Sequence, residues 1–183
     1  MNGFSKTLYL FLFHPKRALE ELEGVGVITA LPLLFVLGGV FAFEAGGKVS
    51  ASGLFLVELF FILVLSLAVT WSLFCFLCTL FSGWLGDSGK LDNYLGGSLY
   101  TLSPFLFLPF GGFYTRTGLP FYWLFLALWS LSLFLGVLNK AYGLNWRKTT
   151  VVTLLSIGYF PFLIFLLPLL VVSILLVTFS WLM

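Results

Sequence analysis

The chain has 183 residues, of which 61% are hydrophobic and only 9% are charged, and its formal net charge is +2 at pH 7. Soluble globular domains are about 45–50% apolar and about 25% charged, so this composition excludes a soluble domain and indicates a membrane protein. So small a net charge predicts no nucleic-acid partner, and two cysteines within one apolar run give no disulfide framework.

Residues 1–23 form an N-terminal segment that we expect at the cytoplasmic surface of the membrane. Its apolar run, Leu8 to Phe13, is too short for the core of a signal peptide. His14 and Pro15 then interrupt the run, and the charged stretch KRALEELE follows. Apolar side chains recur at helical spacing, which predicts two short amphipathic helices with their apolar faces in lipid: Phe4, Leu8, Phe11, Leu12, Ala18, Leu19 and Leu22.

Residues 24–183 contain five apolar runs, which we interpret as five membrane-spanning helices. A spanning helix needs about 20 mainly apolar residues. The runs, each bounded by glycine, charge or both, cover residues 25–43, 54–81, 93–113, 120–139 and 149–182. The second and fifth runs are longer than a bilayer requires, so they must tilt, kink or protrude. Four prolines offer kinks in the third and fifth runs: Pro104, Pro109, Pro161 and Pro168.

The basic residues predict the orientation of these spans. Only Lys48 and Arg116 fall in the first and third loops. The other seven of the nine occupy the N-terminal segment and the second and fourth loops: Lys6, Lys16, Arg17, Lys90, Lys140, Arg147 and Lys148. Basic residues beside spans stay in the cytoplasm, so we expect the N-terminus inside and the C-terminus outside. The predicted fold is thus an all-α, five-span helical bundle, in the cytoplasmic membrane if the source is prokaryotic.

Small and hydroxylic residues are concentrated in the cytoplasmic halves of the last four spans. They allow close helix contact and bonds between helices, which favours a tightly packed inner bundle. The alternative is a cavity open to the cytoplasm. The residues are Ser72, Cys75, Thr79 and Ser82; Gly96, Gly97, Ser98 and Thr101; Ser132, Gly136 and Asn139; and Thr149, Thr153 and Ser156. Seven of them are the candidate polar inner face: Ser72, Thr79, Ser98, Thr101, Ser132, Asn139 and Thr153.

The first span has a different pattern, with Gly38, Ala42 and Gly46 at four-residue steps in its outer half. Such a stripe of small residues predicts close helix contact. Packing within one chain is the favoured interpretation, and self-association between chains stays open.

Residues that could carry chemistry are sparse. Cys75 and Cys78 have the spacing of a redox or zinc motif, but they lie within a span and favour the role of small buried side chains. The loop GWLGDSGK does not have the spacing of a phosphate-binding loop. Glu58, about one turn inside the second span, is the candidate intramembrane carboxylate. We predict no catalytic residues, no metal site and no cofactor.

Two stretches resemble the Yip (Ypt-interacting protein) family of multi-pass membrane proteins, in its prokaryotic form. The opening LFLFHPKRALEELEG, followed directly by a span, is similar to the family's N-terminal segment. Residues 86–109, GDSGKLDNYLGGSLYTLSPFLFLP, are similar to its glycine-bearing loop and third span. The order of the remaining spans agrees, so the resemblance covers essentially the whole chain and implies five spans with a cytoplasmic N-terminus.

Eukaryotic members of that family act in vesicle traffic and associate with small GTPases and with each other. This chain lacks their long acidic N-terminal region and its DLYGP motif, so small GTPase binding is not carried over. We expect a non-enzymatic membrane organiser or adaptor whose partners are the lipid bilayer and either a second copy or other membrane proteins. The alternative function is a small permease or lipid-translocating protein with a polar cavity facing the cytoplasm.

Overall fold

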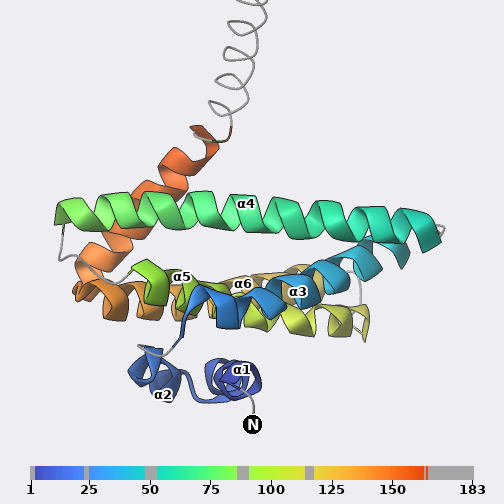
Figure 1. The fold of residues 1–183 in the computed structure, drawn as a ribbon, viewed down its shortest axis with the longest axis horizontal. Helices are drawn as coiled ribbons and strands as arrows, with labels where there is room; N and C mark the ends of the chain where they lie inside the picture. The colour runs from blue at the N-terminus through green and yellow to red at the C-terminus, as the bar shows by residue number, and fades with distance from the viewer. Residues whose placement is uncertain are drawn as a thin grey trace, which may run out of the picture.

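The computed structural model describes residues 3–22, 25–47, 53–85, 91–113, 118–162 and 164, and every element in these ranges is a helix (Figure 1). Two short helices, α1 (Gly3–Phe13) and α2 (Pro15–Glu20), come first. His14 lies between them, and Pro15 takes the first position of α2, where its missing N–H costs no helical hydrogen bond. The Lys6 ammonium lies 2.6 Å from the Glu21 carboxylate, and we call residues 3–22 the N-terminal hairpin.

Three helices are long and apolar enough to cross a membrane: α3 (Val27–Gly47), α4 (Gly53–Leu85) and α6 (Leu119–Tyr142). They correspond to the first, second and fourth predicted spans. Helix α3 begins two residues after the start of its predicted span, and every other helix end lies one to four residues beyond the predicted one. Helix α6 ends at Gly143, whose φ of 61° is a left-handed conformation that suits glycine. The protein is therefore an all-helical membrane protein in the part of the chain that the structure describes.

The third apolar run is not the continuous helix that the sequence predicts. It consists of α5 (Leu91–Tyr100), a turn at Thr101 and Leu102, and the 3-10 helix η2 (Ser103–Phe113). Pro104 explains the break, because its ring has no N–H and clashes with the carbonyl four residues earlier in an α-helix. The proline expected to kink the span therefore ends its α-helix.

The fifth run begins with a C-terminal helix that is described from residue 146 to residue 162 and at residue 164. Pro161 lies within this helix. Pro168 and the rest of the predicted span lie outside the described residues.

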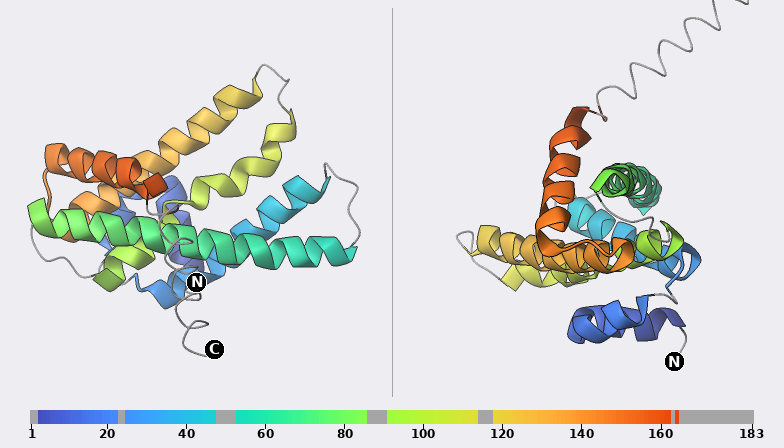
Figure 2. Two further views of the ribbon diagram at one scale, coloured as in Figure 1. Left: turned by 90° about the horizontal axis from the view of Figure 1, so that it is seen from above. Right: turned by 90° about the vertical axis from the view of Figure 1, so that its left-hand side faces the viewer.

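The helices form layers, as Figure 1 and the right-hand view of Figure 2 show. Helices α3, α5 and α6 and η2 make a central layer, with α4 on one side of it and the N-terminal hairpin on the other. Helix α1 appears end-on in Figure 1, where α4 lies lengthwise, and lengthwise in the right-hand view of Figure 2, where α4 is end-on. Helix α1 thus runs crosswise to the long helices.

The ends of the helices that flank the basic segments gather on one side of the molecule. The start of α3, the end of α4, the start of α5 and the end of α6 all lie toward the left of Figure 1. The Lys148 ammonium donates to the carbonyl of Leu85, the last residue of α4, at 2.6 Å. At the opposite end, the Tyr122 hydroxyl of α6 donates to the Phe107 carbonyl of η2.

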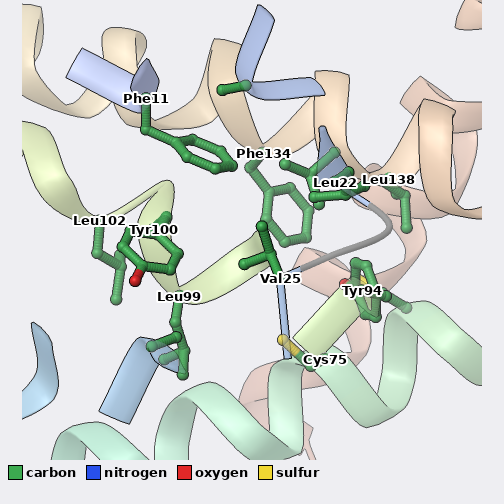
Figure 3. Packing of buried hydrophobic residues seen from close by; sticks show 14 of the residues in the cluster. Phe11, Leu22, Val25, Cys75, Tyr94, Leu99, Tyr100, Leu102, Phe134 and Leu138 are labelled. Carbon is green, nitrogen blue, oxygen red and sulfur yellow. The ribbon is translucent and has the colours of Figure 1, made fainter. Parts of the chain in front are cut away.

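The long helix α4 leaves much of its apolar surface uncovered by protein. Its exposed side chains include Leu54, Val57, Phe61, Ile62, Leu65 and Val69. Large apolar side chains in such a continuous band need an apolar surrounding, which a bilayer supplies. The protein core lies instead between α1, α3, α5 and α6 and the second half of α4 (Figure 3).

Candidate functional site: a buried polar network along α4

Ser98 of α5 is the centre of a buried set of hydrogen bonds to α4. Its hydroxyl donates to the Leu95 carbonyl at 2.9 Å. The indole N–H of Trp71 donates to the Ser98 hydroxyl at 3.2 Å, and the Cys75 thiol lies 3.3 Å from it. A hydroxyl has one proton to donate, so the Cys75 thiol is the donor in its contact with Ser98.

Side chains of α4 also form hydrogen bonds with α6 and with the C-terminal helix. The Cys78 thiol donates to the Ser156 hydroxyl at 3.2 Å, and Ser156 donates to the Val152 carbonyl. The Tyr142 hydroxyl donates to the Thr79 hydroxyl at 2.9 Å, and Thr79 donates to the Cys75 carbonyl. We call the seven side chains of these two sets, together with Tyr94, the polar network: Trp71, Cys75, Cys78, Thr79, Tyr94, Ser98, Tyr142 and Ser156.

Tyr94 belongs to the network by position. Its ring packs on those of Tyr142, with centroids 5.2 Å apart, and Phe134, 6.3 Å apart, and it lies beside Cys75 (Figure 3). Three buried hydroxyls have no hydrogen-bond partner among the described residues: Ser82, Tyr94 and Ser103.

A separate group of hydrogen bonds serves the break between α5 and η2. The Ser130 hydroxyl of α6 donates to the Thr101 carbonyl at 2.7 Å, and the Thr101 hydroxyl donates to the Ser98 carbonyl. The Tyr100 hydroxyl donates to the Thr29 carbonyl of α3 at 2.8 Å. Non-helical backbone at membrane depth needs such partners, because no water is present in the hydrocarbon region to replace them.

The structure divides the seven residues of the predicted polar inner face. Ser98, Thr101 and Thr153 are buried, and Thr79 and Asn139 are partly buried. Asn139 donates to the Leu144 carbonyl, and Thr153 donates to the Thr149 carbonyl within its own helix.

Ser72 and Ser132 are exposed, so they do not join the inner face that the sequence assigns them to. Among the described residues, the Ser132 hydroxyl bonds only to the Trp129 carbonyl in its own helix. Ser72 lies on nearly the same side of α4 as Thr79, because the two are about two helical turns apart. Tyr142 bonds to Thr79, which is nearer the C-terminal end of α4 than Ser72 is. Burial therefore depends on how far each neighbouring helix extends as well as on helical periodicity.

Three hollows that described residues line lie away from these side chains. One, of about 390 Å³, is an apolar groove on the C-terminal helix at Leu154, Leu155, Gly158, Tyr159 and Phe162. A second, about 340 Å³, lies at residues 13–17, and a third, about 190 Å³, lies between α1 and α2.

The apolar face of the N-terminal hairpin packs on protein, which corrects the expectation that it lies in lipid. Phe11 is fully buried and stacks on Tyr100, with ring centroids 5.4 Å apart and planes 16° apart. Ala18 and Leu22 are also buried. Figure 3 shows Phe11 and Leu22 facing the residues of α5 and α6.

Two glycines make this docking possible, and a third lets the segment between the hairpin and α3 approach α5. A Cβ at Gly97 would lie 2.3 Å from a Leu22 methyl carbon, and one at Gly136 would lie 2.9 Å from a Leu19 methyl carbon. A Cβ at Gly96 would lie 2.4 Å from the Val25 carbonyl oxygen. The sequence shows these glycines in the predicted inner halves of two predicted spans, but it does not say what packs against them.

The small-residue stripe of α3 faces α4. A Cβ at Gly38 would lie 2.3 Å from a methyl carbon of Val64, and Ala42 is buried. Gly46 belongs to the last turn of α3, and its surroundings lie outside the described part of the chain. Glu58 is exposed on α4 and forms no ion pair with any described residue, while Lys48, a candidate partner, is outside that part.

Comparison of the chain with protein-family models, with curated proteins and with solved structures finds no match. The resemblance to the Yip family therefore stays an inference from sequence patterns.

Proposed function

We propose that this protein is a non-enzymatic membrane organiser or adaptor of the Yip type, with five spans, a cytoplasmic N-terminus and an external C-terminus. The observation that carries the proposal is that buried polar side chains form hydrogen bonds between helices. Ser98, Cys75 and Cys78 bond from one helix to another, which is what a packed bundle requires. A solute path would need such groups to face an open space.

The proposed topology draws support from the arrangement of the helix ends. The helix ends that flank the basic segments lie at one end of the molecule, and Lys148 bonds to the end of α4 there. Lys and Arg next to membrane spans are typical of the cytoplasmic side. In this proposal α5 and η2 together make the third span, and residues 149–182 make the fifth.

Purification in nanodiscs that retain the native lipid, followed by mass spectrometry of the intact complex, tests the organiser function. The proposal predicts a defined homo-oligomer or a stoichiometric membrane-protein partner. A monomer without a protein partner that retains a specific neutral solute contradicts it.

The second candidate function is a small permease or lipid translocator. Two observations favour it: the break at Thr101 and Leu102, and the unpartnered buried hydroxyls of Tyr94 and Ser103. Interrupted spans in transporters often line binding sites. Proteoliposome flux assays distinguish the two functions, because Ser98→Ala should change flux through a path but not the oligomeric state of an organiser.

A further inference from the structure

We propose that the corner between α1 and α2 binds the phosphate group of an anionic membrane phospholipid. Phe13, His14, Pro15, Lys16 and Arg17 line an open hollow of about 340 Å³ there. This inference rests on the proposed function only in that the N-terminal hairpin lies at the cytoplasmic surface, and it adds a ligand class to that surface.

Two cationic side chains at this corner are available to a ligand. The third basic residue of the hairpin, Lys6, pairs with Glu21 at 2.6 Å. Lys16 and Arg17 are exposed and form no ion pair with any described residue, although Glu20 and Glu21 follow one turn later. A guanidinium binds two phosphate oxygens at once, and an ammonium adds a point charge, so this pair suits a phosphate group.

Aromatic side chains stand next to these charges. Tyr9 and Phe13 are exposed, with ring centroids 5.3 Å apart. The Tyr9 hydroxyl lies 3.3 Å from the His14 ring nitrogen Nε2, which holds the imidazole at the rim of the hollow. Exposed aromatics beside basic residues are typical of the headgroup level of a bilayer.

The direction of α1 and this apolar rim select a lipid over free phosphate. Because α1 runs crosswise to α4, it would run parallel to the surface of a bilayer that α4 crosses (Figures 1 and 2). The exposed Phe13 ring then offers apolar surface to the glycerol and upper acyl chain of the same lipid. A free phosphate ion has no apolar part that could contact that ring.

The test uses the full-length protein in a neutral detergent, with phosphatidylglycerol, phosphatidylcholine and inorganic phosphate as separate probes. Native mass spectrometry counts the lipid that each protein retains. The variant K16A/R17A is compared with K140A/R147A, which removes the same two residue types at exposed positions near the end of α6 and the start of the C-terminal helix. Thermal unfolding and protease resistance of the hairpin show that both variants remain folded.

The proposal predicts that the unchanged protein and K140A/R147A retain one phosphatidylglycerol under conditions that remove phosphatidylcholine. K16A/R17A should weaken this binding by about twenty-five-fold, since each basic residue near an anionic surface contributes a factor of about five. Phe13→Ala should weaken retention of the lipid but not binding of inorganic phosphate.

Equal weakening in the two double variants, or equal retention of phosphatidylcholine, would overturn the site. Binding of inorganic phosphate as tight as that of the lipid would overturn the lipid assignment. The same spectra report the oligomeric state, so loss of lipid binding in an intact assembly contradicts this inference alone. Retained lipid on a monomer without a partner contradicts the organiser function alone.

Discussion

At the scale of single residues, Gly96 sets how closely the chain leading into α3 approaches α5. A Cβ there would meet the backbone at Val25 and Gly26, which cannot rotate away as a side chain can. Gly97 and Gly136 face the flexible ends of Leu22 and Leu19 instead. Glycines that look alike in the sequence therefore differ in how well the structure tolerates a larger side chain in their place.

We predict that Gly96→Ala destabilises the protein by about 1–3 kcal/mol, because overpacking forces the two backbones apart. Gly83→Ala is the matched control, since Gly83 lies in α4 with nothing within 4 Å of its added Cβ. That change should be neutral or stabilise by up to about 1 kcal/mol. Thermal unfolding in detergent measures both, and equal effects of the two changes would refute the close contact at Gly96.

Serines of α6 give a second comparison. Ser130→Ala removes the partner of the Thr101 carbonyl at the break in the third apolar run, which should cost about 1 kcal/mol. Ser132→Ala removes only a bond within its own exposed turn and should cost almost nothing. Unfolding in sodium dodecyl sulfate measures the difference, and a Ser132 effect as large as that of Ser130 would argue against the role given to Ser130.

At the scale of elements, the N-terminal hairpin is a part of the bundle. Its apolar face covers α5 and α6, and its exposed face carries Tyr9, Phe13 and the basic corner. Local sequence predicts two amphipathic helices, but amphipathic periodicity cannot distinguish a lipid surface from a protein surface. The distinction required knowing that Tyr100 and the glycines of two distant spans come together.

Phe11→Ala should release the hairpin, because it removes a fully buried ring stacked on Tyr100 at a cost of about 3 kcal/mol. The matched control is Phe13→Ala, which removes the same ring from a position that is 59% exposed. Limited proteolysis between residues 3 and 22 reports docking. Equal cleavage rates for the two variants would show that Phe11 does not hold the hairpin.

The contact between α3 and α4 gives the next prediction. Gly38→Ala places a methyl group against Val64, whose branched side chain has few alternative rotamers, and should destabilise the protein by about 1–3 kcal/mol. Gly39→Ala is the control, because its nearest neighbour, a Phe60 ring carbon, would lie 3.9 Å away. If Gly38→Ala instead changes only the oligomeric state, the stripe is a contact between chains.

The sequence could predict those parts of the fold that depend on neighbouring residues along the chain. Apolar runs bounded by Gly and charge located the three long helices, because a bilayer imposes a length that sequence displays directly. The break after Tyr100 was signalled only as a kink at Pro104. The exposure of Ser72 and Ser132 could not be derived from periodicity, since it depends on where neighbouring helices end.

At the scale of the whole molecule, we expect the inner halves of the helices to be packed together without an open cavity. The chain's two cysteines lie within these halves, both fully buried, and both thiols bond to serines of other helices. They are natural probes of this packing, because a thiol reacts with a water-soluble reagent only where water reaches it.

The most direct test is labelling of Cys75 and Cys78 by a small, charged methanethiosulfonate reagent in membranes opened to both sides, with labels counted by mass spectrometry. A Lys140→Cys variant adds a thiol at an exposed position and controls for reagent activity. The packed bundle predicts no label on either natural cysteine in the folded protein and two labels after unfolding in sodium dodecyl sulfate. Labelling of either cysteine in the folded protein would contradict the packed bundle and favour a cavity open to the cytoplasm.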